Sequence, residues 1–369
     1  MARRIPLILF GTGQVGRALV AMVLGTRARQ AALELYLDFV ALADREGALV
    51  DERGLDEPVV DSALRLKARG ASLATHERGY YQSDLAALVD VAGQADAIVI
   101  DTTDATTELI MPALVAARRF GYGVVLANKK PLTATLAEFE QLVRRPGTEE
   151  GRADCGYEAT VGAGLPVIRI LRMLLETGDE VQAIRGAFSG TLGYLMTELQ
   201  AGVPFSVAVR EAKRLGYTEP DPRDDLSGAD VARKALILAR TLGLPLEMAD
   251  VAVEPLFPPA FADLDVPLFL ERFVELDEAM AARASEAAAE GSVLRYIAAV
   301  TPDGLRVGLS AEPMRSALGA LRGPDNLVAF HTDRYSRTPL VIQGAGAGAE
   351  VTASAILADI LALATPGWL

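Results

Sequence analysis

The stretch Ile5-Pro6-Leu7-Ile8-Leu9-Phe10-Gly11-Thr12-Gly13-Gln14-Val15-Gly16 decides the fold of this chain. Its first half is a compact apolar run that predicts a buried strand. Its second half is a Gly-x-Gly-x-x-Gly pattern that leads into an Ala- and Leu-rich helix. Glycines at these positions allow a tight turn and let a pyrophosphate approach the helix N-terminus closely. A dinucleotide-binding loop is therefore expected, with a plain strand–helix turn as the alternative. The expected cofactor contacts in the loop are Gly11, Gly13, Gln14, Val15 and Gly16.

Strands and helices continue to alternate after this loop. Apolar runs at 39–43, 95–101 and 123–127 predict strands, and 107–120 predicts a helix between the last two. Such alternation is typical of a doubly wound parallel sheet, which binds its ligands at the carboxyl ends of the strands. We therefore predict an α/β fold with a Rossmann-type dinucleotide-binding domain over residues 1–150.

Polar residues follow the predicted strands of this domain. Asp44 would accept a hydrogen bond from a ribose 2′-hydroxyl, which favours NAD, whereas the adjacent Arg45 would hold the 2′-phosphate of NADP. The separation between Gly16 and Asp44 exceeds the usual spacing of about 20 residues, so either cofactor, NAD or NADP, stays open. Thr103 and Lys129 also end apolar runs on this crest. The alternatives for these two are a helix N-cap and an ordinary strand-end lysine.

The sequence pattern changes after about residue 150. Residues 158–166 predict the start of a new helix, and a glycine-rich segment from residue 343 leads into a last apolar helix. We expect a second, α+β domain over 151–342, and we expect the segment 343–369 to return to the first domain. A charged helical region is predicted at 262–291, and strands are predicted at 181–189, 293–300, 304–310 and 326–332.

The segment 216–234 carries five carboxylates in a loop that runs into an apolar helix. Ser227 is a good N-cap for this helix, and Asp230 three residues later would close a capping box. Asp230 and Lys234 are one helical turn apart. One interpretation is a capping aspartate with a surface ion pair. The other is an ammonium group held by a carboxylate at the mouth of a site, with Glu219 and Asp225 nearby.

The composition narrows the classes of function. A net charge of −13 excludes nucleic acid as an expected partner, since a basic face is its usual footprint. The single cysteine rules out a disulfide framework and favours a cytoplasmic setting. No segment reaches the roughly 18 uninterrupted apolar residues of a membrane span, so no membrane partner is expected.

Few residues are available for acid–base or metal chemistry. His76 and His331 are the only histidines, and neither lies in a promising setting. The proton donor in a carbonyl reduction must then be a lysine, a tyrosine or an acid. Cys155 is better explained as a small buried hydrophobe than as a nucleophile. No cluster of cysteine and histidine supports a zinc site.

Taken together, these segments resemble the homoserine dehydrogenase family over nearly the whole chain. Serine at 189 with leucine at 192 is similar to the fungal and aspartokinase-fused branch. The appended regulatory ACT domain of many relatives is not expected. The segments that carry the resemblance are Gly11–Gly16, Asn128–Pro131, Glu158–Pro166, Phe188–Leu192, Gly216–Lys234 and Gln343–Gly348.

The resemblance implies NAD(P)-dependent interconversion of L-aspartate 4-semialdehyde and L-homoserine, in threonine and methionine biosynthesis, by a homodimer acting on a small-molecule substrate. Lys234 would be the general acid, and Lys129 a second catalytic lysine that also touches the cofactor. Glu219 and Asp230 would bind substrate. The resemblance further implies that Asp225, Tyr217 and Thr191 line the pocket, that Thr103, Gly346 and Gly348 contact the cofactor, and that Glu158, Val161, Ala163 and Leu165 bind a sodium ion through main-chain oxygens.

Two other functions are open. Aspartate-semialdehyde dehydrogenase, another enzyme on a similar cofactor domain, needs a thiolate nucleophile, and Cys155 has no histidine partner in the sequence pattern. A non-catalytic dinucleotide sensor would not need Lys129, Glu219, Asp230 and Lys234 together.

Overall fold

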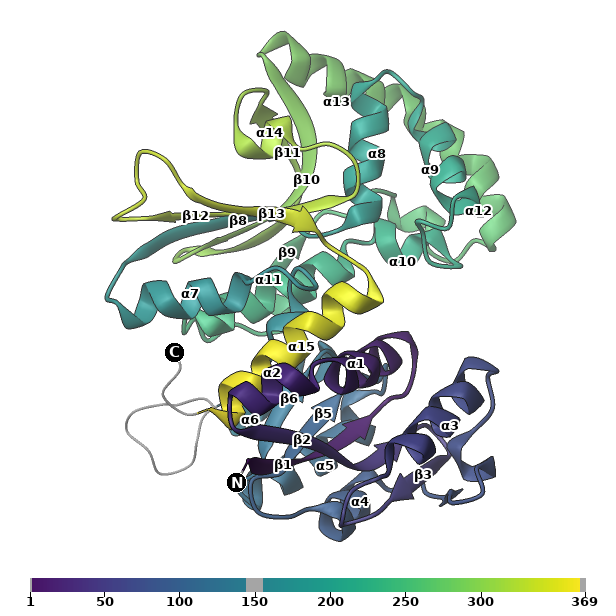
Figure 1. The fold of residues 1–369 in the computed structure, drawn as a ribbon. Coiled ribbons are helices and arrows are strands. Elements are labelled where there is room, and N and C mark those ends of the chain that lie inside the picture. Colours follow the sequence, from purple (N-terminus) through teal and green to yellow (C-terminus); the bar gives the residue numbers. More distant parts are fainter. Residues whose placement is uncertain (1, 144–154, 366–369) are drawn as a thin grey trace. The chain divides into compact units, whose positions relative to one another are not determined.

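A computed structural model describes residues 2–143 and 155–365 of the chain (Figure 1). Their contacts divide the chain into two compact units. Unit 1 comprises Met1–Gly164 together with Gly348–Leu369, and unit 2 comprises Leu165–Ala347. Helices that combine the length and hydropathy needed to span a membrane are absent from the described residues.

Unit 1 contains a seven-stranded sheet with the strand order β4-β3-β2-β1-β5-β6-β7. β1 pairs in parallel with β2 on one side and with β5 on the other, so the strand order reverses at β1. A reversal of this kind creates the crevice in which doubly wound sheets bind ligands. The expected Rossmann-type parallel sheet is confirmed. The parallel strands are β1 (Arg3–Phe10), β2 (Leu35–Ala43), β5 (Ile98–Asp101), β6 (Gly123–Leu126) and β7 (Cys155–Gly156), and the antiparallel ones are β3 (Gly47–Val50) and β4 (Tyr80–Tyr81).

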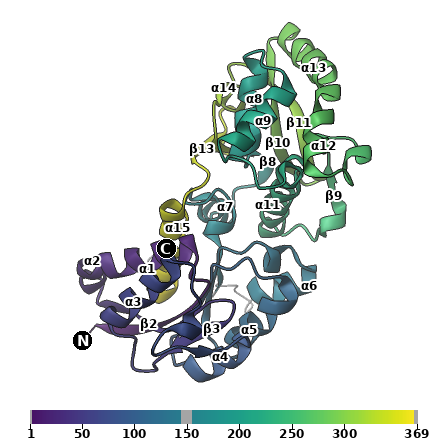
Figure 2. The same cartoon turned by 90° about the vertical axis from the view of Figure 1, so that its right-hand side faces the viewer.

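Helices cover both faces of this sheet (Figures 1 and 2). α1 (Gln14–Gly25) packs beside α15 (Ala349–Ala364), while α4 (Leu85–Ala92) packs beside α5 (Thr107–Arg119). The C-terminal helix α15 belongs to this unit because its apolar side chains join the core of the sheet. The remaining helices of unit 1 are α2 (Arg27–Ala32), α3 (Glu57–Ala68) and α6 (Leu136–Val143), with short 3-10 turns η1 (Leu73–Thr75), η2 (Lys130–Thr133) and η3 (Glu158–Thr160).

Unit 2 contains a six-stranded sheet with the order β13-β12-β8-β10-β11-β9. All pairs are antiparallel except β11 with β9. Helices α8, α11 and α13 all contact the central strand β10. The strands are β8 (Val181–Ala187), β9 (Val251–Val253), β10 (Ser292–Thr301), β11 (Gly304–Pro313), β12 (Asp325–Thr332) and β13 (Leu340–Ala345). The helices are α7 (Val167–Glu176), α8 (Gly190–Gln200), α9 (Phe205–Arg214), α10 (Pro222–Leu226), α11 (Ala229–Thr241), α12 (Val266–Arg272), α13 (Asp277–Ala289) and α14 (Ala317–Ala320), with turns η4 (Met248–Asp250), η5 (Pro259–Phe261) and η6 (Phe273–Leu276).

Two local predictions are wrong. The segment 158–166 does not start a helix directly, because Gly162 and Ala163 both adopt positive φ (80° and 57°) and turn the chain before α7 begins at Val167. Gln343–Ala345 are not loop residues, because they pair with β12 as the end of β13. Glycine content favoured a loop there, and strand pairing overrides it.

Candidate active site

The glycine loop of unit 1 leaves the N-terminus of α1 open. Gly11 has φ +92°, and a Cβ on Gly16 would lie 2.0 Å from the carbonyl oxygen of Gly11, so both positions require glycine. A Cβ on Gly13, the N-cap of α1, would meet nothing within 4 Å. No described side chain caps this helix, so its first N–H groups remain available to an anionic group.

Asp44 forms a dense network that the sequence did not suggest. Its carboxylate accepts hydrogen bonds from Lys67 Nζ at 2.6 Å, from Leu73 N at 2.7 Å, and from the amides of Glu46 and Gly47 at 2.9 Å each. Burial raises the pKa of Asp44, but these donors outweigh it and the net pKa is lowered. The carboxylate therefore stabilises its own turn, while the neighbouring Arg45 is exposed.

A hydrogen-bonded path connects the ends of β5 and β6. Thr103 donates from N and Oγ1 to Asp101 Oδ1 at 2.8 and 2.6 Å, and Ala105 N donates to Thr103 Oγ1 at 3.1 Å. Asn128 Nδ2 then donates to Ala105 O at 3.0 Å, and Asn128 Oδ1 accepts from Lys130 N at 3.1 Å. The path passes from the end of β5 to the turn that contains Lys129.

Asp101 is the most deeply buried carboxylate of this path. It is fully buried, and its Oδ2 has no hydrogen-bond partner among the described residues. Burial raises its pKa to about 6, against the opposing effects of Thr103, Asn128 and Lys130. In the sequence, only its position at a strand end pointed to this residue.

The acidic loop of unit 2 brings four of the predicted substrate residues together. Thr191 Oγ1, on the first turn of α8, donates to Tyr217 O at 2.5 Å. Glu219 N donates to Asp225 Oδ2 at 2.8 Å. Burial raises the pKa of Asp225 against the hydrogen bond from Glu219 N, and the negative charges of Asp230 and Asp224 add to the rise.

Asp230 and Lys234 form the expected pair one turn apart on α11. Lys234 Nζ lies 2.7 Å from Asp230 Oδ2 and donates to Phe188 O at 2.6 Å. Only 12% of the Lys234 side chain is exposed, against 43% of that of Asp230. The surface-pair interpretation assumes two solvated side chains, so the burial of this ammonium favours a site.

The predicted N-cap of α11 is wrong. α11 begins at Ala229, and its N-cap is Gly228, with φ +74°. Ser227 instead follows α10, although its Oγ accepts from Ala229 N at 3.2 Å. Only glycine fits the N-cap position, because a Cβ on Gly228 would lie 2.0 Å from the hydroxyl of Tyr296.

The turn predicted to bind sodium has main-chain oxygens but no cluster of acidic side chains. Across the described residues, no three His, Cys, Asp or Glu side chains could hold a metal together. The carbonyl of Glu158 accepts a backbone hydrogen bond from Val161 N, and that of Leu165 accepts one from Val167 N. Asp359 of α15 anchors the turn by accepting from Glu158 N at 2.9 Å.

Gly346 and Gly348, near the C-terminus, each require glycine for a different structural reason. A Cβ on Gly346 would lie 2.1–2.3 Å from the amide group of Asn326, a fully buried side chain whose Nδ2 and Oδ1 have no partner among the described residues. Gly348 has φ +122° and precedes α15. Packing and backbone conformation thus require glycine at both positions, whatever they contact.

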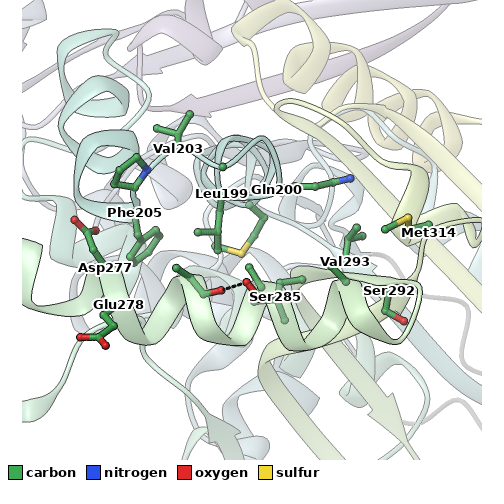
Figure 3. A pocket seen from close by; sticks show the side chains of 17 residues that line it. Leu199, Gln200, Val203, Phe205, Asp277, Glu278, Ser285, Ser292, Val293 and Met314 are labelled. Atoms are coloured by element: carbon green, nitrogen blue, oxygen red, sulfur yellow. Dashed lines mark hydrogen bonds between the residues drawn. The ribbon is translucent and has the colours of Figure 1, made fainter.

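A cavity in unit 2 is separate from these residues. It has a volume of about 580 Å³ and lies between α8, α13 and the start of β10 (Figure 3). Its lining is mostly apolar, and none of the predicted site residues contributes to it. The side chains that define its walls include Leu199, Gln200, Phe205, Asp277, Val293 and Met314.

Comparison with known proteins identifies the family to which the chain belongs. Residues 166–361 match the model of the homoserine dehydrogenase family. The chain is 36% identical to a homoserine dehydrogenase of Emericella nidulans, covering 98% of both chains. It is 45% identical, over 66% of its length, to bifunctional aspartokinase/homoserine dehydrogenase 2 of Zea mays, of which it spans 27%.

Solved structures share the fold. A Candida auris protein of unknown function superposes with a TM-score of 0.84 at 32% identity, with 98% of both chains covered. A hyperthermophilic archaeal homoserine dehydrogenase in complex with NADPH superposes with a TM-score of 0.74 at 23% identity, again over 98% of both chains.

The fold and these matches define the class of the protein, a two-domain Rossmann-type dehydrogenase. More particularly, the chain belongs to the homoserine dehydrogenase family, oxidoreductases that act on a CH–OH group. The resemblance expected from the sequence is confirmed. The chain spans less than a third of the length of the maize bifunctional relative.

Proposed function

We propose that this chain catalyses the NAD(P)-dependent interconversion of L-aspartate 4-semialdehyde and L-homoserine, a step of threonine and methionine biosynthesis. The observation that carries the proposal is the part-buried ammonium of Lys234, held by Asp230 and Phe188 O beside an acidic loop. Two of its three N–H groups are used by these acceptors, and we assign the third to the substrate oxygen.

Different residues would donate the proton and bind the substrate during the reduction. The nicotinamide, when bound, supplies the hydride that adds to the aldehyde carbon. Lys234 donates a proton from Nζ to the aldehyde oxygen as negative charge develops there, which yields the alcohol. The substrate carries both an ammonium and a carboxylate, so its pocket needs both signs of charge. Glu219, with Asp225 beside it, suits the ammonium, and Lys129 keeps the role of a second catalytic lysine that the family resemblance implies.

The glycine loop and the strand ends of unit 1 are suited to binding a dinucleotide cofactor. The uncapped N-terminus of α1, with no atom of the described residues within 4 Å of a Cβ built on Gly13, leaves room for a pyrophosphate at the glycine loop. Thr103 and Lys129 stand at the ends of β5 and β6, next to the switch point of the sheet. The NADPH complex of the archaeal relative supports this role. For the ribose, Arg45 is the exposed candidate, whereas Asp44 already accepts four hydrogen bonds at 2.9 Å or less.

A sodium ion fits the donors of the turn after β7. Main-chain oxygens are the ligands that a hard cation prefers, and those of Glu158, Val161, Ala163 and Leu165 would hold it. The left-handed conformation of Ala163, which is unfavourable for a residue with a Cβ, supports a functional reason for this turn. The ion would fix the turn rather than take part in the reaction. Activity that is indifferent to replacing sodium with a bulky organic cation would argue against it.

A homodimer is the proposed assembly, in a cytoplasmic setting that suits the single cysteine. The supporting observation is that β13 forms one edge of the sheet of unit 2, with Val341 37% exposed. An edge strand with apolar side chains offers a surface on which a second copy can pair about a two-fold axis. Light scattering at micromolar concentration tests this, and a monomer would contradict it.

The two other functions are less well supported. A semialdehyde dehydrogenase would need an accessible thiolate, but Cys155 is completely buried in β7. A non-catalytic sensor would have no use for a buried ammonium paired with a carboxylate in a second unit.

Product analysis separates the three functions. Purified protein is incubated with L-aspartate 4-semialdehyde and NADH or NADPH, and in a parallel arm with the aldehyde, NAD or NADP and inorganic phosphate, and the products are identified by mass spectrometry. Homoserine formed in step with cofactor oxidation supports the proposal. Cofactor binding without product would support a sensor, and turnover only with the oxidised cofactor would support the semialdehyde dehydrogenase.

A further inference from the structure

We propose that Asp101 is a positioning residue for the cofactor side of the site, fixing Thr103 directly and the turn of Lys129 through Ala105 and Asn128. This inference rests on the proposed function, because it concerns the residues to which that function assigns the cofactor. The contacts that carry it lie entirely within unit 1.

The hydrogen bonds that start at Asp101 are continuous. Asp101 Oδ1 receives both the N–H and the hydroxyl of Thr103, which leaves the threonine no rotational freedom at χ1. The same hydroxyl accepts from Ala105 N, whose residue in turn accepts from Asn128. Every step from Asp101 to Lys130 N is 3.1 Å or shorter. Moving Asp101 would therefore release both strand ends together.

The fold keeps an unfavourable buried charge at Asp101. Asp101 is a fully buried carboxylate, and its Oδ2 has no hydrogen-bond partner in the described part of the chain. Such a group is destabilising, and an asparagine would satisfy Thr103 at lower cost. The gain from a carboxylate is the strength of its hydrogen bonds, since charge-assisted bonds are about twice as strong as neutral ones. A charge that stabilises local geometry at the expense of the whole fold is characteristic of functional sites.

The alternative is that Asp101 only closes the turn after β5. Its bond to Thr103 N, two residues on, is the usual Asx-turn contact. These two roles predict different behaviour for Asp101→Asn. A turn-closing residue would lose stability and function together, whereas a positioning charge would lose function while the fold gains stability.

The test uses three variants and one control in the full chain. Asp101→Asn keeps the acceptor and loses the charge, Asp101→Ala loses both, and Thr103→Val removes the hydroxyl alone. Asp179→Ala is the control, because Asp179 is also buried and accepts from a threonine hydroxyl and a backbone amide, but in unit 2. The readouts are the Kd of NADH and NADPH, from the fluorescence of the reduced nicotinamide, the turnover with homoserine, and the Tm.

We expect the cofactor Kd to rise about three- to tenfold in Asp101→Asn and more than about tenfold in Asp101→Ala, the range of one charge-assisted hydrogen bond. The Tm of Asp101→Asn should equal or exceed that of the wild type above neutral pH. Asp179→Ala should lower the Tm and leave the Kd within about twofold. The effects of Asp101→Ala and Thr103→Val should be less than additive in the double variant, because they break one network.

The inference is overturned if Asp101→Asn binds cofactor within about twofold of the wild type, or if the double variant is strictly additive. If Asp101→Ala does not fold, the cofactor Kd and Tm of Asp101→Asn and Thr103→Val still test the positioning role. A wild-type protein that binds neither reduced cofactor would instead contradict the proposed function, so the two failures are distinguishable.

Discussion

Lys234 Nζ and Asp230 Oδ2 lie 2.7 Å apart on successive turns of α11, and the same ammonium donates to Phe188 O at 2.6 Å. Two acceptors from different elements thus orient a single amine. A lysine held in this way loses the rotamer freedom that makes surface lysines poor proton donors, and that freedom is lost before substrate arrives.

Lys234→Ala should reduce turnover by about 10²- to 10⁴-fold, because it removes the proposed proton donor. Cofactor affinity should stay within about twofold, since Lys234 is not among the proposed cofactor contacts, which apart from Gly346 lie in unit 1. Steady-state rates and the NADPH Kd check this. Arg65→Ala is the control, because Arg65 forms an exposed i,i+4 pair with Asp61 and should leave both values unchanged. If Lys234→Ala keeps more than about a third of the wild-type rate, Lys234 is only an ion-pair partner and not the proton donor.

Asp101 should make the stability of the chain depend on pH in the range set by its pKa. Burial raises this pKa to about 6 from 3.8, so below 3.8 the carboxyl is neutral in both the folded and unfolded states. The free energy of unfolding should then fall as pH rises through this window, by about 3 kcal/mol from this group alone. Urea denaturation of the wild type and Asp101→Asn should show a larger advantage for the variant at about pH 8 than at about pH 4. Equal differences at both pH values would contradict the assignment.

Asp44→Ala should destabilise the protein by about 1–3 kcal/mol, because Lys67, Leu73, Glu46 and Gly47 all lose an acceptor. The pKa of Asp44 is lowered, so its contribution is present above 3.8 and is lost as pH falls through the folded-state pKa. Denaturant unfolding at neutral pH measures the change. Asp51→Ala, at a half-buried carboxylate bonded to Arg53 N and Arg78, is the control and should cost less than about 1 kcal/mol. A loss in Asp44→Ala no larger than in the control would show that the network carries no net stability.

Cys155→Ser should retain most of the activity with homoserine. The thiol is completely buried in β7, and the proposed reaction uses no covalent intermediate. Some loss of stability is expected, of about 1–2 kcal/mol, because a hydroxyl replaces an apolar group in the core. Activity per folded molecule is the quantity to compare. Complete loss of turnover in a folded variant would revive the thiolate mechanism.

The parallel sheet of the first domain, the strands of the second domain and the Asp230–Lys234 pair could be predicted from the sequence. Periodicity, glycine spacing and i,i+4 geometry are local properties. The sequence could not predict the role of Asp101 or Lys67, since their partners depend on how distant strands and turns meet. It misassigned the cap of α11 because the hydroxyl of Tyr296, far along the chain, selects Gly228 instead of Ser227. Tertiary contacts, rather than propensity, decided each of these cases.

The measurement that tests the central claim most directly is the homoserine-dependent formation of reduced nicotinamide by the wild type and Lys234→Ala, with NAD and NADP in parallel. The account predicts steady formation of reduced cofactor by the wild type with at least one of the two, none without homoserine, and a loss of about 10²-fold or more in the variant. A folded wild-type protein that reduces neither cofactor, or a variant that matches it, would contradict the account.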